Sequence, residues 1–113
     1  MATLSVQTLT GKGKVIPSFA NAAGGGDVAP NAGGGITIVV RNGDASAKTV
    51  TFKSFAETAL EGTAVADKAF SIPAGGLLIF GPLDVKPWNN GSNQVEITYS
   101  AVTSVTVAVI KGA

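Results

Sequence analysis

Hydrophobic residues in this chain recur at every second position, in short runs separated by turn residues. The clearest alternation covers residues 94–100, where Val95, Ile97 and Tyr99 are separated by polar side chains. Such a two-residue period is typical of a β-strand with one buried face. A second alternating run covers residues 105–110, and the short stretch between the two runs predicts a C-terminal hairpin.

A second pair of strands is predicted in the middle of the chain. Residues 36–40 are a continuous apolar and β-branched run, which ends near the turn dipeptide Asn42-Gly43. Val50 and Phe52 then alternate with polar residues, so we expect these two runs to pair across the loop 42–47. The positions predicted to be buried are Val50, Phe52, Val95, Ile97, Val105 and Val107.

Further short apolar runs at residues 4–9, 69–72 and 77–80 complete an all-β pattern. Each strand is apolar on one face and needs a second sheet to cover it. We therefore predict a single-domain antiparallel β-sandwich or small barrel, jelly-roll-like, of about seven or eight short strands. The expected organisation is an N-terminal arm over 1–16, a Gly-rich extended loop over 17–35 and the main β core over 36–113.

The Gly-rich segment 17–35 differs in kind from the rest. It contains Gly24-Gly25-Gly26 and Gly33-Gly34-Gly35, and Phe19 and Val28 are its only large apolar residues. Such a stretch cannot form a core of its own. We expect it either to lie along a partner or to be poorly ordered when the protein is alone.

The composition narrows the possible functions. The 113 residues include no cysteine and no histidine, only 13% are charged, and the formal net charge is +1. Thiolate and Ser-His-Asp catalysis, Cys/His zinc sites and disulfides are therefore excluded. The basic residues are scattered, and no apolar run approaches the length of a membrane helix. We expect no enzymatic activity, no cofactor, no metal, no nucleic-acid partner, no membrane partner and no export signal.

The few candidate sites have ordinary structural alternatives. Neither glycine triplet is followed by the Lys-Ser/Thr of a phosphate-binding loop, so flexible turns are the favoured interpretation. Asp27 and Asp84 stand near several asparagines without the regular acidic spacing of a calcium loop. Lys12 and Lys14, set among glycines, are either a solvated turn or a pair of cations for an acidic partner surface.

The only tryptophan, Trp88, lies in the polar loop 86–93. One interpretation is that it caps an open end of the sandwich, as buried indoles often do. The alternative is an interface anchor or a platform on which a sugar stacks, because a loop tryptophan buries a large area at small entropic cost.

A set of turn and strand motifs, spread from about Gly24 to Ile110, resembles one known group of proteins. The group comprises small proteins encoded beside the major capsid protein of tailed bacteriophages: capsid decoration (cement) proteins and related minor head proteins. The motifs are Gly26-Asp27, Pro30-Asn31, Arg41-Asn42-Gly43, Thr49-Val50-Thr51, Ala64-Val65-Ala66-Asp67, Ile72-Pro73-Ala74-Gly75, Gly81-Pro82, residues 95–100 and residues 103–109.

The resemblance implies a β-rich module, made in the host cytoplasm, that binds the outer surface of the assembled head. There it would bridge major capsid protein subunits, with neighbouring copies of itself as further partners, for example in a trimer. A tail, neck or head-fibre component and a carbohydrate-binding module using Trp88 remain the alternatives. Our candidate partner-binding residues come from the N-terminal run, the Gly-rich segment and the tryptophan loop: Lys12, Lys14, Asp27, Asn31, Trp88 and Asn89.

Overall fold

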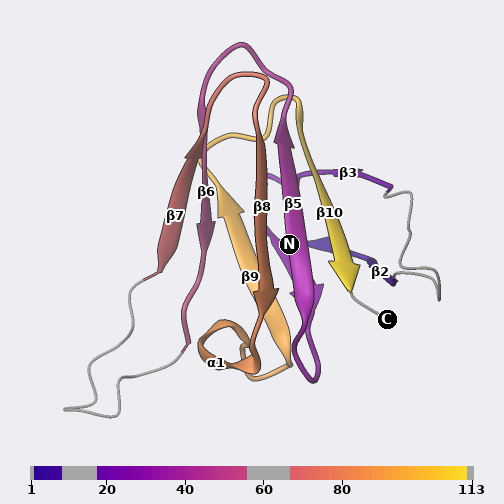
Figure 1. Cartoon of the computed structure of the whole chain (residues 1–113). Coiled ribbons are helices and arrows are strands. Elements are labelled where there is room, and N and C mark those ends of the chain that lie inside the picture. Colours follow the sequence, from indigo (N-terminus) through magenta and orange to yellow (C-terminus); the bar gives the residue numbers. More distant parts are fainter. Residues whose placement is uncertain (1, 9–17, 56–66, 112–113) are drawn as a thin grey trace.

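Nearly all regular structure in this protein is β-strand, arranged in two facing sheets (Figure 1). The computed structural model describes residues 2–8, 18–55 and 67–111. No helix in these ranges is long and apolar enough to cross a bilayer. The elements they form are β1 (Ala2–Thr3), β2 (Val6–Thr8), β3 (Ala20–Asn21), β4 (Asp27–Pro30), β5 (Ile36–Asn42), β6 (Lys48–Phe52), β7 (Lys68–Ile72), β8 (Leu77–Leu83), α1 (Val85–Trp88), β9 (Gln94–Tyr99) and β10 (Val105–Lys111).

The first sheet has the strand order β1-β4-β9-β6-β7, and the second has the order β2-β10-β5-β8, with β3 also paired to β10. β1 runs parallel to β4 and β2 runs parallel to β10, so both sheets are mixed and the expected wholly antiparallel arrangement is wrong. No pairing in the described residues joins the sheets into a closed barrel, which removes that alternative. The all-β, sandwich-like fold itself is confirmed.

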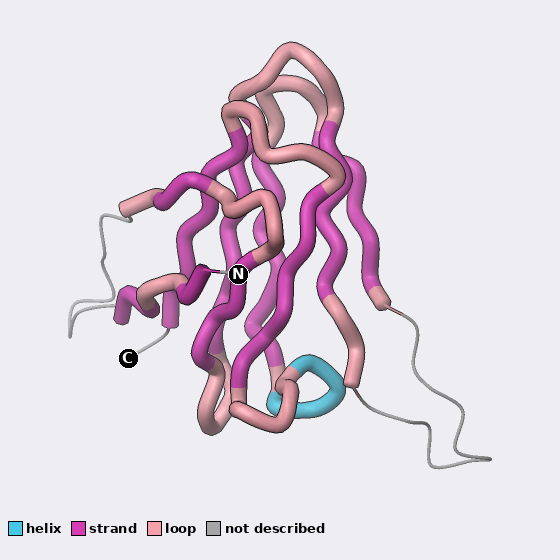
Figure 2. Tube along the Cα trace, turned by 180° about the vertical axis from the view of Figure 1, so that it is seen from behind, coloured by secondary structure: helices cyan, strands magenta, loops and turns pink. Residues whose placement is uncertain are grey.

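The described residues form ten strands where the sequence pattern predicted about seven or eight. The additional strands lie toward the N-terminal end and are β1, β3 and β4, with two, two and four residues. Strands this short contain too few side chains to show an alternating pattern. Two of the short strands, β3 and β4, lie within the Gly-rich segment 17–35, and Val28 and Ala29 of β4 are buried. Seen from behind, the short helix α1 lies at one end of the strands (Figure 2).

Both predicted hairpins are wrong, because in each of them the two strands lie in different sheets. β5 lies in the second sheet and β6 in the first, while β9 lies in the first sheet and β10 in the second. An alternating pattern shows that one face of a strand is buried, and a crossing between facing sheets buries that face as well as a hairpin does. The local pattern therefore could not distinguish the two connections.

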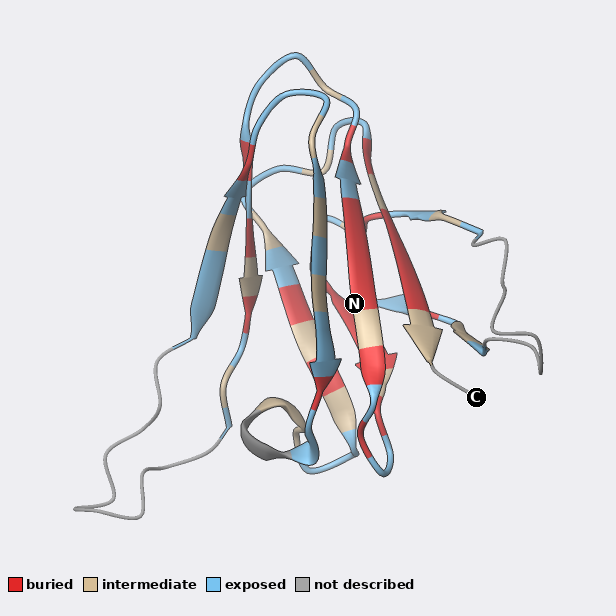
Figure 3. Ribbon diagram, in the orientation of Figure 1, coloured by how far each residue is buried: buried red, intermediate tan, exposed pale blue. Residues whose placement is uncertain are grey.

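The core lies between the two sheets, where the inward faces of both are buried (Figure 3). All six positions predicted to be buried are at most 1% exposed. Aromatic rings also join the sheets: the ring centroids of Phe52 on β6 and Phe80 on β8 are 4.4 Å apart. The alternation in the sequence thus identified the correct face of each strand even where it gave the wrong pairing.

The side chain of Asn42 fixes two of the crossings between the sheets. This residue ends β5 and is fully buried. Its Nδ2 donates to the carbonyl oxygens of Ser46 at 2.9 Å and Ile72 at 3.0 Å, and its Oδ1 accepts from the backbone N–H of Asp44 at 3.0 Å. A buried amide needs such partners, since an unpaired polar group costs about 1–3 kcal/mol. Asn42 therefore connects the turn after β5 to the end of β7.

Candidate interaction surface

The structure separates the sequence candidates into three groups. Lys12 and Lys14 lie outside the described residues. Asp27 begins β4, whereas Asn31 follows the last residue of that strand. Asn89 directly follows α1 and is hydrogen-bonded to Asn31, so these two candidates meet beside Trp88 at the end of the sandwich that α1 occupies (Figure 1).

Asp27 is fully buried, and its carboxylate serves the interior of the protein. Oδ2 accepts hydrogen bonds from the Tyr99 hydroxyl at 2.7 Å and from the backbone N–H of Ala23 at 3.2 Å. Oδ1 is buried and has no hydrogen-bond partner in the described residues. Burial, and then the hydrogen bond and negative charge of Asp27, raise the pKa of Tyr99 well above its ordinary value. The Asp27 side chain has no exposed surface to offer a partner.

Asn31 is also buried, at 1% exposed, and forms a reciprocal pair with Asn89. Its Nδ2 donates to Asn89 Oδ1 at 2.8 Å, while Asn89 Nδ2 donates to the backbone oxygen of Asn31 at 2.8 Å. The Oδ1 of Asn31 accepts from the backbone N–H of Ile36 at 3.3 Å. These bonds attach the residue after α1 to the segment between β4 and β5. Asn31 therefore shapes this end of the molecule from within.

Trp88 is partly buried and packs against the core from the end of the sandwich. Its ring stands edge-on to that of Phe80, with the centroids 5.3 Å apart and an interplanar angle of 82°. Phe80 in turn contacts Phe52 and Phe70, at centroid distances of 4.4 and 5.0 Å. Edge-to-face pairs of this kind are favourable beyond the area that they bury. The exposed part of Trp88 is thus held in a fixed position beside Asn89.

Four large apolar side chains in the described part of the chain are exposed, and none of them was among the sequence candidates. Leu77 and Ile79 on β8 are 53% and 64% exposed, Val85 in α1 is 40% exposed, and Phe55 is 38% exposed. The apolar run 77–80 has no alternation, so the sequence does not show which of its side chains are exposed. In the structure β8 is an edge strand, whose outer face is not covered over Leu77 and Ile79.

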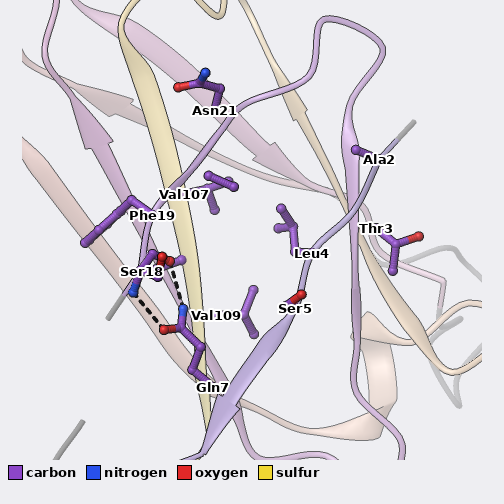
Figure 4. Close-up of a pocket in the computed structure, with 12 residues that line it drawn as sticks. Ala2, Thr3, Leu4, Ser5, Gln7, Ser18, Phe19, Asn21, Val107 and Val109 are labelled. Carbon is purple, nitrogen blue, oxygen red and sulfur yellow. Dashed lines mark hydrogen bonds between the residues drawn. The ribbon is translucent and has the colours of Figure 1, made fainter. Parts of the chain in front are cut away.

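A pocket of about 320 Å³ lies on the opposite side of the second sheet from β8, between the N-terminal arm and β10 (Figure 4). In its wall the arm is bonded to the beginning of the Gly-rich segment. Gln7 Nε2 donates to the backbone oxygen of Ser18 at 2.9 Å, and Gln7 Oε1 accepts from the backbone N–H of Ser18 at 2.7 Å. The pocket is lined by Ala2, Thr3, Leu4, Ser5, Gln7, Ser18, Phe19, Ala20, Asn21, Val107, Ala108 and Val109. These side chains are small or uncharged, so the pocket suits a neutral group.

The described part of the chain contains no group of three or more His, Cys, Asp or Glu residues placed to hold a metal ion. Comparison with known proteins gives no match: no family model, no curated protein and no solved structure is similar to this chain at a significant level.

Proposed function

We propose that this chain is a virion structural protein of tailed bacteriophages: a capsid decoration (cement) protein without enzymatic activity. It would bind the outer surface of the assembled head and stabilise contacts between major capsid protein subunits. The proposal rests on the motif resemblance from about Gly24 to Ile110, together with the order of the strands in the two sheets.

The strand order is the structural observation that carries the proposal. Without the arm strands β1 and β2, the sheets read β3-β10-β5-β8 and β4-β9-β6-β7, and every neighbouring pair is antiparallel. Eight antiparallel strands in this order, in which only β6 and β7 follow each other within one sheet, are typical of a jelly roll, an architecture found in viral capsid and lectin domains. The topology supports a capsid role, although one fold serves several functions.

The surface composition favours adhesion to protein over recognition of a charged ligand. Only 13% of the residues are charged and the net charge is +1, so there is little field to attract a polyanion. A protein that binds the assembled lattice, but not the free coat subunits, stabilises the lattice by mass action. Many copies on one head add weak contacts through avidity, and no chemical step is needed.

We propose the end of the sandwich at α1 as the surface that contacts the head. It presents Val85, which is 40% exposed, beside the exposed parts of Trp88 and Asn89. The packing of Trp88 against Phe80 and the hydrogen bonds of Asn89 to Asn31 hold the side chains of Trp88 and Asn89 in place. This lowers the entropic cost of binding. The buried Asn31 would support this surface through its bonds to Asn89 rather than contact the partner. Asp27 bonds to Tyr99 and Ala23 and is no longer proposed as a contact residue.

Purified protein added to undecorated, expanded heads tests the proposal directly. We expect saturable binding, measured as copies per head, that depends only weakly on salt because the surface carries few charges. Val85→Lys should weaken binding. Thr98→Lys, on the exposed outer face of the first sheet, should not. Absence of saturable binding would overturn the proposal. Electron microscopy of labelled virions would separate a head-wide lattice from a tail, neck or head-fibre position.

A carbohydrate-binding module is the second candidate, favoured by the partly exposed Trp88 beside Asn89 and Asn90. Glycan-array binding that disappears in Trp88→Ala would support it, provided that the variant keeps the circular dichroism spectrum of the folded protein. Head binding without glycan binding would reject it.

A further inference from the structure

We infer that β8 is a self-pairing edge: two copies of this chain join their second sheets in antiparallel fashion, across a two-fold axis at Ile79. The inference concerns the free protein and does not depend on the proposed function. Its observations are the direction of the unpaired backbone groups, the exposed apolar side chains and the absence of charge along β8.

The hydrogen-bond pattern shows which backbone groups of β8 are directed away from its partner. The N–H of Asn42 donates to the carbonyl oxygen of Gly76 at 2.9 Å. Bonded and non-bonded residues alternate in an antiparallel pair, so Leu78 and Phe80 bond to β5. The N–H and C=O groups of Leu77 and Ile79 consequently point to the open side of β8, where no strand in the described ranges pairs with them.

The same two residues carry the exposed side chains of the strand. Leu77 is 53% exposed and Ile79 is 64% exposed, and both lie on the outer face of the second sheet. Leu78 and Phe80 alternate with them and pack against the core. An open edge with exposed apolar side chains is a template for pairing with another strand.

Natural edge strands are protected from such pairing by charged residues, by proline or by β-bulges. The edge strand β7 of the first sheet begins with the exposed Lys68, whereas no residue from Ile72 to Leu83 is charged. In β8 the proline and the register shift against β5 occur only beyond Phe80, so Leu77 to Phe80 lack all three kinds of protection.

The lack of charge and the order of side chains favour a second copy of this chain as the partner of the open edge of β8. The residue on a two-fold axis lies beside its own counterpart, so a charge there would repel itself. β8 has no charge to do so. A register centred on Ile79 places Ile79 beside Ile79 and Leu77 beside Gly81, which has no side chain and leaves room for the leucine. The N–H and C=O of each Ile79 would bond to the C=O and N–H of the other.

The expected dimer is weak. Pairing of one short strand buries less than the roughly 1,200 Å² found in stable protein complexes. It should therefore form at high concentration and dissociate on dilution. Where many copies are held close together, as they would be on a head, the same contact would link neighbours through its high effective concentration.

Single-cysteine variants test the geometry, because the chain has no cysteine of its own. In the proposed register the two Ile79 Cα atoms are about 5.5 Å apart, a distance that a disulfide spans. Ile79→Cys should therefore give a disulfide-linked dimer under mild oxidation. The two Leu77 Cα atoms are separated along the strands by four residues, about 13 Å, so Leu77→Cys should not. Thr98→Cys, on the outer face of the first sheet, is the control for random collision.

Sedimentation velocity tests the association without cross-linking. We expect the sedimentation coefficient of the wild-type protein to rise with concentration, that of Ile79→Lys to stay at the monomer value and that of Thr98→Lys to follow the wild type. Circular dichroism checks that each variant is folded. A wild-type protein that stays monomeric at all concentrations overturns the inference. Leu77→Cys cross-linking as readily as Ile79→Cys overturns the antiparallel register. Loss of head binding with the dimer intact would affect only the proposed function.

Discussion

The hydroxyl of Tyr99 donates a 2.7 Å hydrogen bond to Oδ2 of Asp27, which joins the end of β9 to the beginning of the neighbouring β4. The same carboxylate oxygen accepts from the N–H of Ala23, so the pair also holds the turn that precedes β4. Tyr99 is the only tyrosine in the chain. The ionisation of its phenol can therefore be followed without a contribution from other tyrosines.

Folded protein should resist ionisation of Tyr99. The pKa of its phenol is raised, first by burial and then by the hydrogen bond and charge of Asp27. An unperturbed tyrosine has a pKa of about 10. We expect the native protein to show no tyrosinate absorbance at that pH. The same protein in concentrated urea should titrate at this ordinary value. A native titration that coincides with the unfolded one would contradict the contact.

The raised pKa also predicts a loss of stability in alkali. Folding favours the neutral phenol, so this contribution is complete below the unfolded pKa of about 10 and is lost as the pH rises from there toward the folded pKa. Tyr99→Phe should lack this alkaline component and should cost about 1–3 kcal/mol at neutral pH, because it removes a donor from a buried carboxylate. Urea unfolding of both proteins from neutral pH upward measures the difference. Parallel curves would show that Tyr99 does not contribute.

Ile97 gives a direct test of the core. It is fully buried between the sheets, whereas the next residue on β9, Thr98, is exposed. Ile97→Ala should lower the free energy of unfolding by about 2–5 kcal/mol, from lost burial and a residual cavity. Thr98→Ala should change it by less than about 0.5 kcal/mol. Chemical denaturation of the two variants checks this, and equal effects would mean that the faces of β9 are assigned wrongly.

The reciprocal amide pair predicts energetic coupling between Asn31 and Asn89. Asn31→Ala leaves the buried N–H of Ile36 without its side-chain acceptor and removes the partner of Asn89. A double-mutant cycle with Asn89→Ala should give a coupling energy of about 0.5–3 kcal/mol. Additive effects of the two substitutions on the free energy of unfolding would show that the pair is not energetically significant.

Gly81 should be intolerant of any side chain. A Cβ placed there would lie 2.8 Å from the backbone oxygen of Ile36 and 2.8 Å from the Cα of Thr37, and its φ of +142° strains an L-residue. Gly81→Ala should therefore destabilise the fold by at least about 1–3 kcal/mol. Gly91→Ala is the matched control, since a Cβ at Gly91 meets nothing within 4 Å. Thermal unfolding of the two variants compares them, and similar midpoints would argue against the close approach of β5 and β8.

The candidate interaction site was less accessible to sequence reasoning than the core. Asp27 and Asn31 are polar residues in a Gly-rich segment, which normally indicates solvent exposure, yet tertiary hydrogen bonds from Tyr99 and Asn89 allow them to be buried. Conversely, the apolar run that contains Ile79 has no alternation to mark an exposed face, and only the strand order shows that it forms an open edge. In both cases the deciding partner lies far away in the sequence.

The sequence by itself determined that this protein is built of short strands. It also determined which face of these strands is buried, namely the face that carries Val50, Phe52, Val95 and Ile97. The reason is that alternation is a local property of an extended chain with one face removed from water. Only the tertiary structure decided which strands are neighbours, that successive strands cross between sheets, and which polar residues are enclosed. Those outcomes depend on backbone hydrogen bonds between distant segments, and a hairpin and a crossing leave the same local pattern.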